Sequence, residues 1–109
     1  MANKYGARRT WSNLCNRTFS SKLEAQRGEE LCLLQLAGEI SELNYQEKFV
    51  LSEEPKVTIT IDFCYHKKGD YGYTYEDTKG MGETREFRVK RLWLREKLGI
   101  DVILIRETR

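Results

Sequence analysis

Two aspartates and a lysine lie at spacings that suit metal-ion chemistry. Asp62 lies in an alternating apolar run, and Asp77 and Lys79 end the next run, where a spacing of two along a strand places both on the same face. If the two runs pair as a hairpin, Asp62 and Asp77 come close enough to share a cation, and two carboxylates with a backbone carbonyl suit Mg²⁺. A lysine beside them could orient or deprotonate a water molecule and neutralise charge that develops on a phosphoryl group. The alternative is a polar sheet face with an ordinary Asp–Lys pair.

Two more charged residues lie beside apolar stripes on predicted helices. On a helical wheel Glu24 lies between two apolar groups, away from the most polar face. The alternative for Glu24 is a capping box, in which its carboxylate binds back to the Ser21 amide. Lys90 lies between the apolar stripe of the second helix and Trp93. Its ammonium could extend to the sheet edge where Asp77 points, or follow the apolar surface into solvent.

The hydrophobic pattern predicts one small α+β domain. Residues 1–19 are polar, basic and aperiodic, so we expect an arm that orders only on docking or on binding a partner, followed by a single domain over 20–109. The first helix begins after Ser21 and ends near Ala37, before Gly38, with Leu23, Leu31 and Leu34 facing the core. The later elements are strands at 43–51, 57–66 and 71–79, a helix at 85–98 between Thr84 and Gly99, and a strand at 100–105. This αβββαβ order predicts a mixed central sheet flanked by helices, whose last two strands pair in parallel or flank a common neighbour.

The net charge of +2 on 109 residues hides two basic segments. The first 23 residues contain five bases and no acid, and residues 85–97 contain six bases against two acids. Such segments favour a polyanionic partner, although solvated helix faces and a loose tail are the alternative. An apolar run of the roughly 18 residues that a membrane span needs is absent from the sequence, as is a hydrophobic signal core, so we expect a cytoplasmic protein with no membrane partner.

The three cysteines, Cys15, Cys32 and Cys64, fit no zinc or disulfide framework. Cys64 and His66 share a strand face, but two ligands do not make a zinc site. We therefore expect reduced, buried thiols. A single histidine without a suitable nucleophile beside it also makes a triad hydrolase a poor fit.

The ordered set of charged residues resembles the PD-(D/E)XK nuclease superfamily. More closely, several segments are similar to a phage-encoded branch that is placed near Holliday-junction resolvases, and the resemblance spans about residues 4–105. These segments are F-S-S-K-L-E-A at 19–25, G-E-I at 38–40, Q-x-x-F at 46–49, D-F at 62–63 and E-D-T-K-G at 76–80. One departure is Ile61, which stands where the superfamily name has proline.

The resemblance implies a restriction-endonuclease-like core and a role for each matching residue. Asp62, Asp77 and Glu24 would be ligands of Mg²⁺, with Mn²⁺ as a substitute, and Lys79 would position water or stabilise charge. Gln46 matches a position of the branch to which no role is assigned. Glu76 competes with Asp77 for the metal, but strand alternation turns it to the face opposite Lys79.

The function implied is a divalent-metal-dependent DNA endonuclease that hydrolyses phosphodiester bonds in phage recombination, replication or repair. Branched DNA such as a Holliday junction is the candidate substrate, and symmetric cutting of it would need a homodimer. The phosphate backbone would be held by the basic arm and the second helix through Lys90, Arg85, Arg88, Arg91, Arg8, Arg9 and Lys22. The alternatives are a nucleic-acid-binding module with a nuclease-like fold that no longer cuts, and a small basic interaction protein. Four intact motif residues favour the enzyme over the inactive module.

Overall fold

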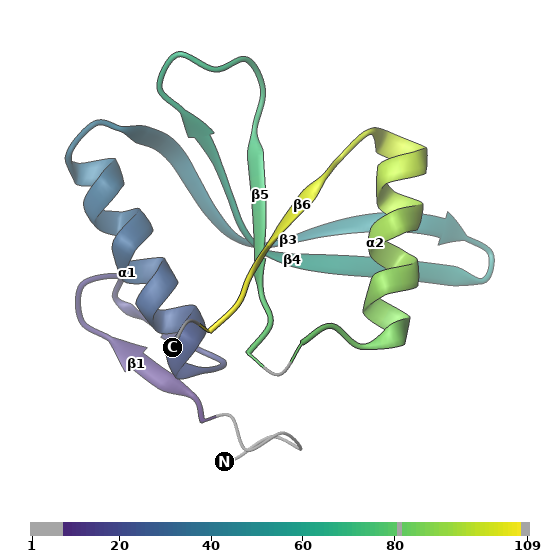
Figure 1. Ribbon diagram of the computed structural model, residues 1–109, viewed down its shortest axis with the longest axis horizontal. Coiled ribbons are helices and arrows are strands. Elements are labelled where there is room, and N and C mark those ends of the chain that lie inside the picture. The colour runs from purple at the N-terminus through teal and green to yellow at the C-terminus, as the bar shows by residue number, and fades with distance from the viewer. Residues whose placement is uncertain (1–7, 81, 108–109) are drawn as a thin grey trace.

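The element order of the chain is β-β-α-β-β-β-α-β in the computed structural model, which describes residues 8–80 and 82–107 (Figure 1). The elements are β1 (Thr10–Ser12), β2 (Arg17–Phe19), α1 (Lys22–Leu36), β3 (Ile40–Glu53), β4 (Lys56–Lys67), β5 (Thr74–Thr78), α2 (Arg85–Leu98) and β6 (Val102–Ile105). From α1 onward this is the predicted αβββαβ order.

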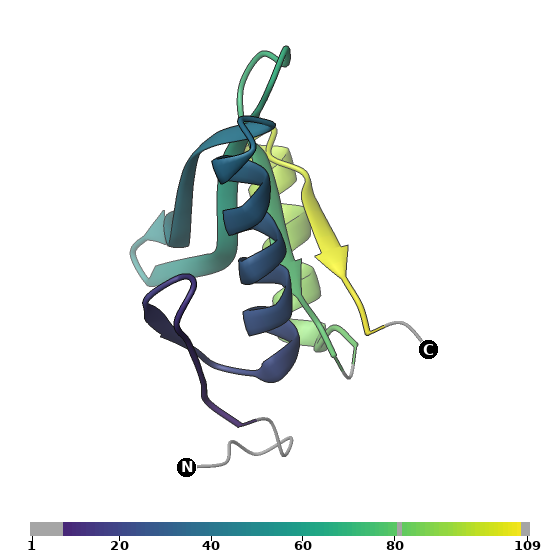
Figure 2. The same ribbon diagram turned by 90° about the vertical axis from the view of Figure 1, so that its left-hand side faces the viewer.

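A mixed four-stranded sheet of order β3-β4-β5-β6 forms the centre of the fold. The β3–β4 and β4–β5 pairs are antiparallel, and β5 pairs in parallel with β6. Because a parallel pair needs a crossover connection, α2 between β5 and β6 lies against the sheet. Figure 2 shows the strands between α1 in front and α2 behind. The predicted α+β class, a mixed sheet flanked by helices, is confirmed.

Both helices begin and end at the residues that the sequence indicates. The Ser21 hydroxyl accepts the Glu24 amide over 3.1 Å, and the Thr84 hydroxyl accepts the Phe87 amide over 3.1 Å. Beyond the helix ends, Gly38 and Gly99 have φ of 80° and 69°, which glycine adopts without a steric penalty. Neither helix is long and apolar enough to cross a membrane.

The core is divided into two clusters by the course of the long β3–β4 hairpin, which changes direction behind β5 (Figure 1). The alternation predicted for β4 is present, but its apolar residues serve both clusters. Phe63 and Tyr65 pack beneath α1, whereas Ile59 and Ile61 pack with Leu94 of α2. The strand bounds differ from the predicted ones mainly in β3, which is longer, and in β5 and β6, which are shorter.

The buried face of α1 is not the predicted leucine stripe. Leu31 is fully buried, but Leu23 is half-buried and Leu34 is exposed. The buried face is instead centred on Glu24, Ala25, Gly28 and Leu31. The physical reason is the ring of Phe19, which packs so tightly on the helix that a Cβ on Gly28 would lie 2.6 Å from its Cζ atom.

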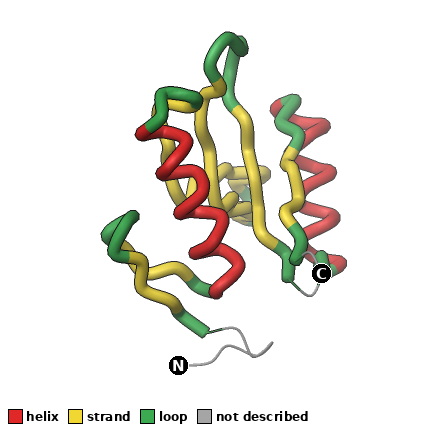
Figure 3. The backbone as a smooth tube through the Cα atoms, turned by 60° about the vertical axis from the view of Figure 1, so that its left-hand side comes forward, coloured by secondary structure: helices red, strands yellow, loops and turns green. Residues whose placement is uncertain are grey.

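Residues 10–19 of the expected arm are ordered and docked on α1. Strands β1 and β2 form an antiparallel hairpin against α1, and Phe19 is only 2% exposed (Figure 3). The Ser12 hydroxyl donates to Glu29 of α1 over 2.5 Å, which fixes the hairpin to the helix. Residues 1–7 of the predicted arm lie outside the described residues.

Candidate functional site

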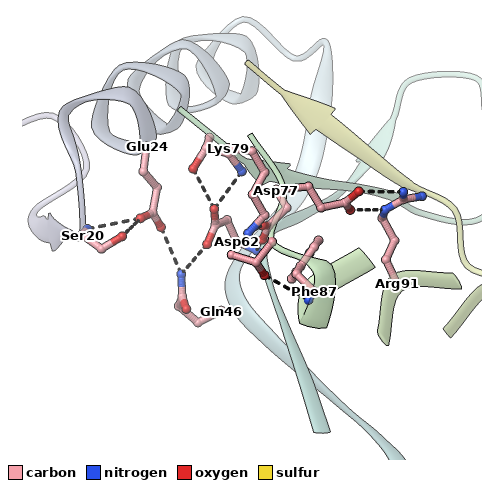
Figure 4. Close-up of polar contacts among 11 residues, drawn as sticks. Ser20, Glu24, Gln46, Asp62, Asp77, Lys79, Phe87 and Arg91 are labelled. Carbon is pink, nitrogen blue, oxygen red and sulfur yellow. Dashed lines mark hydrogen bonds and ion pairs between the residues drawn. The ribbon is translucent and has the colours of Figure 1, made fainter. Parts of the chain in front are cut away.

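Three of the predicted carboxylates gather where α1, β4 and β5 meet, as Figure 4 shows. The strand register places side chains in a row across the sheet, because Tyr45 and Glu47 pair with Phe63 and Ile61 and so set Gln46 opposite Asp62. By the same count Asp77 follows the Glu76–Phe63 pair and faces Asp62 from β5. The hairpin that the sequence predicted therefore does bring the two aspartates together.

Asp62 is held at the point where β4 and β5 diverge. Its backbone amide donates to Oδ1 of Asp77 over 2.9 Å. Its own Oδ2 accepts the Thr78 amide over 2.9 Å and the Thr78 hydroxyl over 2.8 Å. Oδ1 of Asp62 remains directed at Gln46 of β3, whose amide nitrogen lies 3.2 Å away. The two neighbouring strands, β3 and β5, thus fix this carboxylate.

Glu24 projects from the first turn of α1 into the same region and is 2% exposed. Only half of the expected capping box forms: Ser21 caps the helix, but the Glu24 carboxylate bonds elsewhere. Its Oε1 accepts the hydroxyl and the amide of Ser20, and its Oε2 accepts the Gln46 amide over 3.0 Å. Glu24 is therefore joined to Asp62 through Gln46, which favours the site over the capping alternative.

Burial and like charge raise the pKa values of two carboxyl groups in the site. Burial is the larger cause at Asp77 and the charge of Asp62 the second, and together they raise its pKa to about 6 although Lys79 opposes them. The pKa of Glu24 is also raised, first by burial and then by Asp62, against hydrogen bonds from Ser20 and the charge of Arg17. Raised carboxyl pKa values mark a place that favours a cation or a proton.

Lys79 lies on the same face as Asp77, as strand alternation predicts. Its Nζ is 2.7 Å from Oδ2 of Asp77 and 3.7 Å from the centroid of the Phe87 ring in α2. The aromatic face and the carboxylate both stabilise the ammonium and fix its position beside the aspartate. The alternative, an ordinary Asp–Lys pair on a solvent-exposed sheet face, does not fit, because Asp77 is only 2% exposed.

Glu76 faces the other way, also as predicted, and is bound by residues outside the site. Arg27 of α1 donates to both carboxylate oxygens over 2.7 Å, and the Tyr65 hydroxyl donates to one of them. These bonds raise the pKa of Arg27 and, after burial, that of Tyr65. The bidentate pair ties the helix that carries Glu24 to the strand that carries Asp77.

The predicted nucleic-acid contacts divide into exposed and paired residues. Arg8, Arg9, Lys22, Arg85 and Arg88 are exposed. Lys90 and Arg91 differ from the expectation. Each is paired with a carboxylate and is not free to bind a polyanion or to extend to the sheet edge. Lys90 lies 3.8 Å from Glu86 on its own helix and forms no ion pair with Asp77, and Arg91 donates to both oxygens of Glu83 over 2.5 and 3.1 Å.

Sequence reasoning did not assign the residues that support the carboxylates. Gln46 was noted without a role, and Ser20, Thr78 and Arg27 were not considered as part of the site. Gln46 has φ of 54°, which is uncommon for a residue other than glycine, and this turns its amide between Glu24 and Asp62. The sequence signal for Gln46 is its match to the Q-x-x-F segment of the branch, and its place opposite Asp62 follows from the strand register.

The donor set suits a hard divalent cation, although the carboxylates do not yet form a closed cage. Among residues 8–80 and 82–107, no three His, Cys, Asp or Glu side chains form a group able to hold a metal ion. The Gln46 amide nitrogen lies at the point to which Glu24 Oε2 and Asp62 Oδ1 are both directed. Carboxylate oxygens are nevertheless ligands that a hard cation such as Mg²⁺ prefers and a softer ion does not.

The family of this chain follows from a match over nearly its whole length. The family model of DUF1064, described as a protein of unknown function, matches residues 2–105, so the chain belongs to this family. No curated protein and no solved structure matches the chain.

Proposed function

We propose that this protein is a divalent-metal-dependent endonuclease that hydrolyses phosphodiester bonds in DNA. The observation that carries the proposal is the juxtaposition of Asp62, Asp77 and Lys79 on paired strands, with Glu24 joined to them from α1. The resemblance of the ordered motifs to PD-(D/E)XK nucleases supports the same reading. The branch that the sequence resembles makes branched DNA the first substrate to test.

In this proposal Asp62, Asp77 and Glu24 hold the cation, Mg²⁺ or Mn²⁺. A bound divalent cation stabilises negative charge on the phosphoryl oxygens and lowers the pKa of a bound water molecule. Lys79, fixed between Asp77 and the Phe87 ring, orients the attacking water and neutralises charge as it develops on the phosphate. Gln46 donates to Glu24 and to Asp62, over 3.0 and 3.2 Å, and so links the two carboxylates.

The basic residues that remain exposed would bind the DNA backbone. Arg85 and Arg88 lie on the first turn of α2, and Arg8, Arg9 and Lys22 lie at the N-terminal side of the fold. Such contacts give affinity that falls steeply with salt and carries no sequence preference. A homodimer is the assembly that would cut a four-way junction symmetrically.

The test is cleavage of a labelled four-way junction beside linear duplex and single strand of the same sequence. Each is incubated with Mg²⁺, with Mn²⁺ and with EDTA, using wild type and Asp77→Asn. Paired nicks on the junction that need metal and Asp77 would support a junction resolvase, and cutting of all three substrates would support a general nuclease. Cleavage by Asp77→Asn equal to that by wild type would remove Asp77 from the site.

A catalytically inactive DNA-binding module is the second candidate. The observation in its favour is that the described carboxylates do not close into a metal-binding group, with an amide between two of them. This candidate predicts that wild type binds DNA equally with Mg²⁺ and with EDTA and cuts none of the substrates.

A further inference from the structure

Three arginines of the described chain are half-buried, and their environments differ. Arg27 donates to both oxygens of Glu76, and Arg91 donates to both oxygens of Glu83. Arg17, on β2, has no such carboxylate and forms no ion pair with any described residue. Arg17 is therefore the half-buried arginine of the described residues that no described carboxylate binds directly.

Arg17 is nevertheless held in one place by aromatic rings. Its guanidinium carbon lies 4.0 Å from the centroid of the Tyr45 ring and 5.5 Å from that of Phe19. The Nε atom is buried and has no hydrogen-bond partner, which is true of no other buried side-chain nitrogen or oxygen in the described residues. Buried polar groups are nearly always bonded, so Arg17 keeps hydrogen-bonding capacity that no described residue uses.

Arg17 lies near Glu24, one of the carboxylates of the site. It is three residues before Ser20, which donates to Glu24. The charge of Arg17 is close enough to favour the ionised form of Glu24. Its guanidinium therefore lies at the side of the site formed by the N-terminal hairpin.

We infer that Arg17 is a phosphate ligand that binds the DNA backbone beside the Glu24–Gln46–Asp62 row. A guanidinium that stacks one face on a tyrosine keeps its edge donors free for the oxygens of a phosphodiester, which it can bind in a bidentate way. This inference rests on the proposed function and adds a contact that the two basic segments did not single out. It also gives the β1–β2 hairpin a role, which is to carry this arginine to the site.

A purely structural role for Arg17 makes a different prediction. If it only packs on Tyr45, then Arg17→Met, which keeps an apolar stem of similar length, should preserve both the fold and DNA binding. If it binds phosphate, Arg17→Met should fold and lose affinity, and Arg17→Lys should recover only part of the loss, because lysine keeps the charge without the fork of donors.

The experiment measures binding of a labelled four-way junction and a linear duplex by fluorescence anisotropy in EDTA, over a series of salt concentrations. The variants are Arg17→Met, Arg17→Lys and Lys68→Ala, the last removing an exposed charge in the β4–β5 connection as a matched control. Thermal unfolding of each variant verifies its fold. We expect Arg17→Met to weaken binding about tenfold or more and to reduce the salt slope by about 1, with Lys68→Ala close to wild type.

The outcomes separate this inference from the proposed function. If wild type binds DNA and folded Arg17→Met behaves like Lys68→Ala, Arg17 is not a phosphate ligand, and the nuclease proposal still stands. If Arg17→Met unfolds, folded Arg17→Lys decides, since undiminished affinity with lysine would overturn the bidentate contact. If wild type binds neither DNA in EDTA, both proposals are wrong about the surface.

Discussion

The backbone amide of Asp62 donates to the carboxylate of Asp77 over 2.9 Å, so that the strand carrying one acid partly neutralises the other. Burial of Asp77, and then the charge of Asp62, nevertheless raise the pKa of Asp77. Stability alone does not explain why two carboxylates lie side by side on β4 and β5. The arrangement is typical of sites where charge is collected for a ligand.

The raised pKa of Asp77 predicts an unusual pH dependence of stability. The ordinary value is 3.8 and the folded value about 6, so above pH 6 both folded and unfolded states are ionised and the fold bears the full cost, up to about 3 kcal/mol. As the pH falls from 7 through 6 toward 4, the folded state binds its proton first, and the free energy of unfolding gains this contribution.

Urea unfolding in EDTA at pH 7 and pH 5 measures the effect. Wild type should gain stability relative to Asp77→Asn between these values, because asparagine carries no proton to bind. The prediction fails if the difference between the two proteins is the same at both pH values.

Much of this fold could be predicted because its signals are local. The caps at Ser21 and Thr84, with glycines beyond both helix ends, depend on neighbours within a few residues, and so do the bounds of α1 and α2. The alternation of β4 is equally local and placed Asp62 correctly. Asp77 and Lys79 followed from the two-residue period of one strand.

The remainder depends on contacts between distant segments. Strands β1 and β2 have three residues each, too few for a period, and they are fixed by Phe19 against Gly28 in the next element. The position of the Gln46 side chain depends on a positive φ, which the residue type does not predict. Arg27 binds Glu76, which is 49 positions away in the chain, and Arg17 stacks on Tyr45, which is 28 positions away. Neither contact has a pattern in the sequence that predicts it.

Gln46 offers a test of cation binding that does not depend on cleavage. Gln46→Glu adds a carboxylate at the position from which the Gln46 amide now donates to Glu24 over 3.0 Å and to Asp62 over 3.2 Å. In EDTA at pH 7 we expect the free energy of unfolding to fall by about 1 kcal/mol or more. The reason is that two hydrogen bonds are replaced by repulsion between carboxylates.

Divalent cation should reverse that loss. Thermal unfolding with Mg²⁺ should raise the Tm of Gln46→Glu more than that of wild type, because an extra oxygen ligand strengthens binding to the folded state. Gln46→Met, which loses the hydrogen bonds without adding charge, is the control and should show no such gain. An equal response of all three proteins would argue against a cation at this point.

The Arg27–Glu76 pair should be the most sensitive charged contact for folding. Arg27→Met leaves the Glu76 carboxylate, which is 1% exposed, without its cation, and this costs about 3 kcal/mol. The double variant Arg27→Met/Glu76→Gln should recover part of this, because the amide is neutral and the Tyr65 hydroxyl keeps a partner. Urea unfolding checks both, and Arg95→Met, an exposed arginine of α2, should change stability by less than about 0.5 kcal/mol. Equal losses for the single and double variants would mean that the pair contributes by packing alone.

Two of the three free thiols are placed to react with each other. The sulfur atoms of Cys15, in the β1–β2 turn, and Cys32, in α1, are 2.9 Å apart, and Cys32 also contacts the Tyr45 hydroxyl at 3.2 Å. With oxidised glutathione as oxidant, exchange should form one intramolecular disulfide, with both thiol protons lost and two molecules of reduced glutathione released. Closing the loop between these cysteines should add about 3 kcal/mol to the free energy of unfolding, because it limits the conformations of the unfolded chain.

Mass spectrometry should show the loss of two hydrogen atoms, and thermal unfolding should show a higher Tm that reductant reverses. Cys64→Ser should keep the effect and Cys32→Ser should abolish it; a stable mixed disulfide with glutathione in wild type would show that the hairpin and α1 do not hold the thiols in reach.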